Sequence, residues 1–154
     1  MKSVTLGVRT AFVQALQGIT FEGEAIPVWE EVANPGKANL TIGNVDVEAY
    51  IIIQNQTAND MSAKCRRTDQ TSIQVQINTL FPIGSGGSWI AEQISELVCD
   101  KLFTATNLGT SIVMPEPFQM WRSTLESSRN IPYQTDVNFV WVHNMTFIAW
   151  VSQN

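Results

Sequence analysis

Hydrophobic residues recur along the chain with two different spacings, one typical of helices and the other of strands. Apolar side chains at helical spacing predict a first helix over Ser3–Gln17, with Ser3 as its N-cap and Gly18 as its stop. The same spacing predicts a second helix over Ser88–Phe103. Strict two-residue alternation in Thr71–Phe81 predicts a strand with one face in the core and one face outside it.

The remaining segments complete an order of elements that favours one fold class. The other predicted strands are Pro27–Val32, Glu48–Gln54, a short one at Ser111–Val113, Phe118–Ser127, and Val137–Val151, which is bent near His143-Asn144 or is two strands. Turn signals predict a loop or protruding hairpin at Ala33–Val47, and Asn55–Asp69 is predicted to be a long polar loop. The order α-β-β-β-α-β-β predicts a single α+β domain over residues 1–154, with a mainly antiparallel or mixed sheet and both helices on one face.

A glycine-serine loop, Gly84–Ser88, joins the alternating strand to the second helix, which is the local order of a phosphate-binding site. A Walker-type loop also needs a lysine beside its last glycine, whereas no charged residue occurs from Gln70 through Ala91. Strands of nucleotide-binding parallel sheets are apolar on both faces, and this strand is apolar on one. Backbone N–H groups at a helix start can still hold an anion. A small nucleotide- or phosphometabolite-binding protein therefore stays an alternative to a plain strand-to-helix connection.

Composition narrows the classes of function. Only 15% of the 154 residues are charged, against about 25% in an average protein, and uncharged polar residues take their place. Amides cost less to desolvate than ions, which suits burial in subunit contacts. The outer face of the alternating strand carries three such amides: Gln74, Gln76 and Asn78. A net charge of −5 disfavours a protein that grips DNA, which would need a basic stripe.

The residues that carry enzyme chemistry are sparse. The single histidine, His143, lies within an apolar strand without a nucleophile motif, so it is either a general base or a hydrogen-bonded strand residue. Cys65 and Cys99 have no CxxC spacing and are expected to be free thiols. We expect no catalytic residue, no metal and no cofactor. We also expect no membrane segment and no export signal, since no apolar run approaches transmembrane length.

Two charged clusters have two interpretations each. Glu92, Glu96 and Asp100, called here the acidic stripe, fall at i, i+4 and i+8 on the second helix. They form a solvated face, or a surface that repels DNA or receives a basic arm. Lys64, Cys65, Arg66 and Arg67 form the one concentrated basic segment, which is either a solvated loop or a docking contact for an acidic partner.

The order and texture of these segments resemble a known family. A helix of the type Val-Arg-Thr-Ala-Phe-Val-Gln-Ala-Leu precedes a Pro-Val-Trp strand, a Tyr-Ile-Ile-Ile strand and an Ile-Gln-Val-Gln-Ile strand. A glycine-bearing loop then leads into Ile-Ala-Glu-Gln-Ile-Ser-Glu-Leu-Val, and long antiparallel strands follow. This pattern is similar to the tail terminator, or tail-completion, proteins that join tail to head in long-tailed bacteriophages.

The resemblance implies a non-enzymatic virion protein, assembled in the host cytoplasm, that forms a hexameric ring. Its implied partners are further copies of itself, the tail tube protein, a head-side connector, and DNA that passes through the lumen without sequence-specific binding. The acidic stripe would face the lumen. The implied subunit or partner contacts are Lys64, Arg66, Arg67, Gln74, Gln76, Asn78, Gly86, Gly87 and Trp89. Another neck component, such as a head-completion or connector protein, is the nearest alternative.

Overall fold

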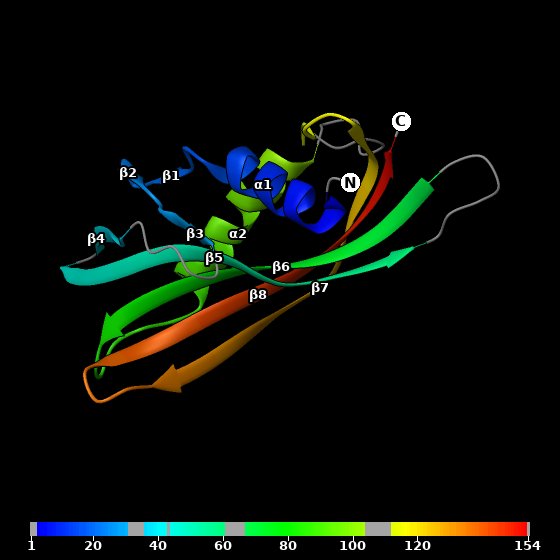
Figure 1. Cartoon of the computed structure of the whole chain (residues 1–154). Helices are drawn as coiled ribbons and strands as arrows, with labels where there is room; N and C mark the ends of the chain where they lie inside the picture. The colour runs from blue at the N-terminus through cyan, green and yellow to red at the C-terminus, as the bar shows by residue number, and fades with distance from the viewer. Residues whose placement is uncertain (1–2, 31–35, 43, 61–66, 104–111, 154) are drawn as a thin grey trace.

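Figure 1 shows the computed structural model, which describes residues 3–30, 36–42, 44–60, 67–103 and 112–153. The helices are α1 (Val4–Leu16) and α2 (Trp89–Leu102). The strands are β1 (Thr20–Phe21), β2 (Glu24–Ala25), β3 (Val28–Glu30), β4 (Ala38–Ile42), β5 (Val45–Asp60), β6 (Arg67–Pro82), β7 (Phe118–Gln134) and β8 (Asn138–Gln153). Within this part of the chain no helix is both long enough and apolar enough to cross a membrane.

One mixed sheet organises the molecule, with the strand order β3–β5–β6–β8–β7. Strand β3 runs parallel to β5, whereas β4, β6, β8 and β7 each pair antiparallel with their neighbours. Both helices pack on the same face of this sheet and against each other (Figure 1), α1 over β5 and β6 and α2 over β6 and β8. The chain therefore has the predicted α+β fold with its helices on one face.

The two helices begin and end close to the predicted residues. The Ser3 hydroxyl accepts a hydrogen bond from the Leu6 N–H group at 3.3 Å, which caps the first turn of α1. Gly18 then takes a positive φ of 83°, which turns the chain away from the helix. Ser88 precedes α2 and Phe103 ends it. Helical periodicity therefore identified both elements correctly.

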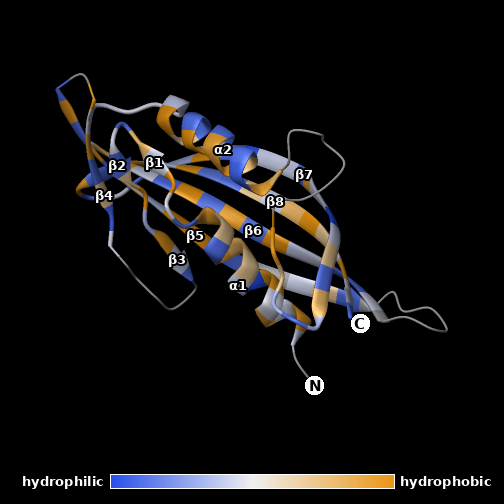
Figure 2. Ribbon diagram, turned by 90° about the horizontal axis from the view of Figure 1, so that it is seen from above, coloured by the Kyte–Doolittle hydropathy of each residue, from blue (hydrophilic) through white to orange (hydrophobic). Residues whose placement is uncertain are grey.

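The core lies between the helices and the alternating strands. Along β6, Ile73, Val75 and Ile77 are fully buried, while Gln74 and Gln76 between them are half-buried on the other face. Figure 2 shows the resulting alternation of hydrophobic and hydrophilic residues along the central strands beneath the helices. Aromatic rings complete the packing from above, as α1 brings the Phe12 ring to 5.8 Å from the Phe147 ring of β8.

The prediction of a long loop at Asn55–Asp69 is wrong over most of its length. Strand β5 continues to Asp60 and β6 already begins at Arg67, with a register shift between Gln54 and Thr57. This end of the hairpin is polar, and Thr57, Ala58 and Asn59 are all exposed, so it has no apolar alternation. Backbone pairing with β6 holds it extended instead, together with contacts such as the 2.6 Å hydrogen bond between the hydroxyls of Thr57 and Ser72.

The remaining strand predictions need smaller corrections. Strand β8 is one continuous strand that pairs with β6 without a register shift, so the two-strand alternative is wrong. The irregularities lie in β7, which also extends beyond the predicted Ser127 to Gln134. The predicted loop or hairpin at Ala33–Val47 contains β4 and the first residues of β5, which pair as an antiparallel hairpin. Ile112 and Val113 form no strand, and Ser111 is outside the described residues.

We expect Phe12→Ala to lower the free energy of unfolding by about 3–5 kcal/mol, because a fully buried ring that packs on Phe147 would leave a cavity. Urea unfolding followed by circular dichroism measures this loss. Leu6→Ala is the matched control, since Leu6 lies on the same helix and is 53% exposed; its effect should stay within about 0.5 kcal/mol. Equal losses in the two variants would contradict this description of the core.

Candidate functional site

The Gly84–Ser88 loop is a tight turn between β6 and α2. The Ser85 N–H group and hydroxyl both donate to the Pro82 carbonyl, at 3.2 and 2.8 Å. Gly84 and Gly86 have φ values of +91° and +128°, a region that favours glycine. A Cβ atom on Gly86 would stand 3.3–3.4 Å from the rings of Phe81 and Phe139. The glycines are therefore explained by the backbone conformation of the turn and, at Gly86, by close packing against two aromatic rings.

The surroundings of this loop offer little to a phosphate. A pocket of about 140 Å³ lies beside it and is lined by Ile42, Val45, Val47, Phe81, Ser85, Gly86, Trp89 and Ile90. No charged residue is among these lining residues, and the Ser88 side chain makes no capping hydrogen bond to α2. A phosphate here would be held by backbone N–H groups alone, without the cation that phosphate-binding loops employ.

The acidic stripe lies along the exposed side of α2. The side chains of Glu92, Glu96 and Asp100 are all exposed to solvent. Glu92 is nevertheless engaged, because the Asn130 amide nitrogen on β7 donates to its carboxylate at 2.8 Å. Glu96 and Asp100 are therefore the two members of the stripe that make no such contact with another described element.

Asn130 extends this contact to the one histidine. Its amide oxygen lies 2.7 Å from Nδ1 of His143 on β8, and since an amide oxygen can only accept, His143 Nδ1 carries the proton. Burial lowers the pKa of His143, and the negative charge of Glu92 opposes this with a smaller upward effect. The neutral imidazole thus ties the start of α2 to the β7–β8 hairpin through Asn130. Of the two interpretations of His143, this geometry favours a hydrogen-bonded strand residue over a general base.

Cys99, the cysteine within the described residues, is also in an unreactive setting. Cys99 is half-buried on α2, and burial raises the pKa of its thiol, with further upward contributions from Asp100 and Glu96. A raised pKa keeps the thiol protonated and poorly nucleophilic at neutral pH. Within the described residues, no three His, Cys, Asp or Glu side chains are grouped closely enough to hold a metal ion.

The sheet face opposite the helices is a further candidate surface, and we call it the helix-free face. Its central strands contribute the side chains of alternate residues, which the cross-strand pairs Gln76 with Asn144 and Asn78 with Val142 place on one side. The predicted contacts Gln74, Gln76 and Asn78 all lie here. Asn78 is only 4% exposed. Amides and aliphatic side chains thus share this face.

An aromatic group extends the helix-free face toward β7 and was not predicted as a group. Trp150 on β8 has the Arg122 guanidinium 4.8 Å from its ring centre, and the Trp121 ring lies 6.1 Å away. The register shift between Met120 and Arg122 makes Trp121 an extra residue in β7. A bulge has no local sequence signal, so nothing in the sequence could link Trp121 to Trp150.

The structure divides the predicted contact residues between two faces. Gly86, Gly87 and Trp89 lie at the start of α2, on the helix-covered side, while the three amides of β6 lie on the helix-free face. Trp89 is 45% exposed. Lys64 and Arg66 lie outside the described residues. Arg67 is the first residue of β6. These residues consequently do not form one site.

Comparison with known proteins relates the fold to a virus-like particle. No protein-family model matches the sequence, and no curated protein matches it. Among solved structures, a chain of a "virion of native gene transfer agent (GTA) particle" matches with a TM-score of 0.69 and 14% sequence identity. The match covers 99% of this chain and 99% of that chain. At this level of identity the comparison shows a shared fold over the whole described domain.

We predict that acidification destabilises the protein through His143. The pKa of His143 is lowered below the usual value of 6.5 in the folded state. Above about pH 6.5 the imidazole is neutral both folded and unfolded, so its contribution is complete there. As the pH falls through this value toward the folded pKa, the unfolded chain gains the proton first and stability is lost.

Because the sequence has one histidine, urea unfolding at about pH 7.5 and pH 5.5 isolates this effect from other groups. His143→Asn should show a smaller difference between the two pH values than the natural chain, whatever its stability at the higher pH. An unchanged difference would show that His143 is not responsible.

Proposed function

We propose that this chain is a non-enzymatic structural protein of a phage-like virion. The observation that carries the proposal is the fold likeness to a chain of a gene transfer agent virion, which spans practically the full length of both chains. A match of this extent leaves no large part of the chain for a separate catalytic unit. The uncharged pocket beside the glycine loop and the raised pKa of the Cys99 thiol support the same conclusion.

We further propose that the chain acts as a tail terminator, forming a ring that ends the tail tube and meets the head-side connector. Support comes from the order of elements described above and from a surface that is poor in charge. A ring built from heterologous contacts closes on itself and leaves no unpaired contact surface, which limits assembly to a fixed size. DNA would pass through the lumen without specific binding, in keeping with the net charge of −5.

The acidic stripe is our candidate for the lumen lining, through Glu96 and Asp100 in particular. Both carboxylates are exposed, and Glu92 is already engaged with Asn130. Carboxylates repel DNA phosphates and so keep the passing duplex from adhering to the wall. The segment from Lys64 to Arg67 remains a candidate contact for an acidic partner such as the tube or connector.

The purified protein should form rings, alone or on tail tubes. Light scattering gives the mass in solution, and negative-stain electron microscopy shows whether particles are annular and whether they sit at the head-proximal end of isolated tubes. A tube preparation without the protein is the control for end density. A chain that stays monomeric and leaves tube ends bare would refute the terminator function.

Reversing the stripe tests its role separately from assembly. Glu96→Lys combined with Asp100→Lys should leave circular dichroism and ring formation unchanged, because both side chains are exposed, but should reduce infectious or transducing particles at least tenfold. Glu22→Lys with Glu24→Lys makes the same charge change at exposed positions in the β1–β2 hairpin and should have little effect. Equal titres from the two double variants would remove the stripe from the lumen.

A further inference from the structure

Charged residues on the helix-free face are confined to its two lateral edges. Strands β6 and β8 occupy the middle of the sheet, and their residues on this face carry no charge from 68 to 82 and from 138 to 153. Strand β5 and its partner β4 bring the carboxylates of Asp46 and Glu48 to one edge. At the opposite edge, β7 brings the guanidinium groups of Arg122 and Arg129, which pair with Trp150 and Asn144 on this face. Glu126, the extra residue of the second register shift, also lies on β7, so this edge carries two cations and one carboxylate and is net positive. The face thus has an acidic edge and a basic edge.

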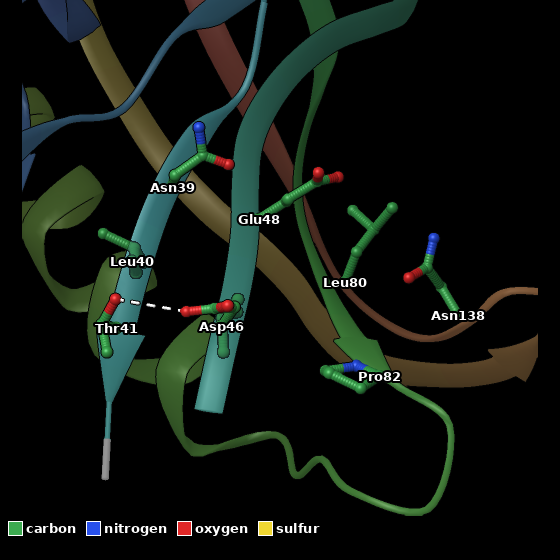
Figure 3. Close-up of a pocket in the computed structure, with 9 residues that line it drawn as sticks. Asn39, Leu40, Thr41, Asp46, Glu48, Leu80, Pro82 and Asn138 are labelled. Carbon is green, nitrogen blue, oxygen red and sulfur yellow. Dashed lines mark hydrogen bonds between the residues drawn. The ribbon is translucent and has the colours of Figure 1, made fainter. Parts of the chain in front are cut away.

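The acidic edge is hollowed into a pocket of about 390 Å³, which we call the edge pocket (Figure 3). It is lined by Asn39, Leu40, Thr41, Asp46, Val47, Glu48, Leu80, Pro82 and Asn138. The Thr41 hydroxyl donates to Asp46 at 3.3 Å, and Lys37 pairs with Glu48 at 3.2 Å. The Lys37 ammonium offsets one of the two carboxylates, which leaves the pocket with a net negative charge centred on Asp46.

The basic edge offers one cation without a partner. Arg122 stacks on Trp150, whereas Arg129 is exposed and forms no hydrogen bond or ion pair with another described residue. Arg129 cannot reach the edge pocket of its own chain. The pocket extends to Asn138 on β8, but Arg129 pairs with Asn144, and at about 3.4 Å per residue the intervening stretch of β8 is roughly 20 Å long, well beyond the length of an arginine side chain. The complementary charges can therefore meet only between two molecules.

A neighbouring molecule would contact the β7 edge mainly through side chains, because backbone pairing is hindered there. Pro132 lies in the exposed half of β7 and offers no N–H group to an added strand. Register shifts at Met120/Arg122 and Leu125/Ser127 interrupt the rest of β7. Bulges and proline are the means by which edge strands avoid pairing with other sheets. A neighbour at β7 would accordingly contact the projecting side chains.

We propose that the edge pocket receives Arg129 of an adjacent copy of this chain, so that the basic edge of one sheet meets the acidic edge of the next. The guanidinium would form a bidentate pair with Asp46, and the amide oxygens of Asn39 and Asn138 would accept its remaining N–H groups. The contact is heterologous, and repeated around an axis it closes a ring. This inference rests on the proposed ring and names the surfaces that join its subunits.

A charge exchange tests the pairing. Arg129→Glu alone and Asp46→Arg alone should each weaken self-association at least tenfold, measured by light scattering over a concentration series at low salt. The double variant should recover most of the natural association, because the two charges are exchanged across the same contact. Lys101→Glu, an exposed cation on α2, is the matched control and should associate like the natural chain.

A covalent test works even where association is weak. In a Cys65→Ser, Cys99→Ser background, Asp46→Cys and Arg129→Cys are made as separate single-cysteine chains and treated with a short bismaleimide. Covalent dimers should form when the two chains are mixed and not in either chain alone, because the contact joins unlike surfaces. Dimers within each separate chain, or none in the mixture, would overturn the proposed pairing.

The outcomes separate this inference from the proposed function. If rings form as well in the single charge variants as in the natural chain, the edge pairing is refuted. The proposed ring would still stand. A natural chain that neither oligomerises nor binds tube ends, together with single-cysteine chains that do not cross-link in the mixture, would refute both. Loss of rings in either single variant and their return in the double variant would support both.

Discussion

The alternation of apolar and amide side chains along β6 is the constraint on which the rest of the structure depends. Ile73, Val75 and Ile77 commit one face of the central strand to burial, and β5 and β8 pair with it in registers that put their own apolar residues on the same side. Two helices suffice to cover that side, and nothing in the described chain covers the other. The sheet consequently has one helix-covered face and one helix-free face, and each candidate surface lies on one of the two.

Local periodicity explains which elements could be predicted. The α1 and α2 helices and the alternating part of β6 carry their signal within a short window, so their identity followed from the sequence. The distal half of β5 has no such signal, because its extended form depends on pairing with β6. The same limit applies to the sites. The spacing of the acidic stripe was visible on one helix, whereas the engagement of Glu92 depends on Asn130, which lies 38 residues away in the chain.

The glycine loop shows that the same local order of elements can occur in a phosphate-binding site or in a packed turn. Its order of strand, turn and helix start matches a phosphate-binding site, but the positive φ of Gly86 and the nearby rings of Phe81 and Phe139 favour glycine there without any ligand. Close packing of this kind fixes where α2 begins over the sheet, and the Glu92–Asn130–His143 chain then holds that end of the helix to the β7–β8 hairpin. The position of the acidic stripe is thus set by an apolar contact and a neutral hydrogen-bonded chain.

The apolar side chains at the centre of the helix-free face are already shielded from water. This limits which parts of the face could contribute binding energy to a contact. Val140 and Val142 at its centre are only 2% and 7% exposed, because neighbouring side chains of the same sheet already shield them. Covering the centre would remove little further apolar area from water, and burial stabilises in proportion to that area. The apolar area still available lies along β7, where Trp121 and Tyr133 are each 47% exposed on the strand that carries Arg129. An edge that combines exposed aromatic surface with an unpaired guanidinium has the composition of an interface anchor. The proposed assembly through this edge would therefore be favoured by the distribution of apolar area as well as by charge.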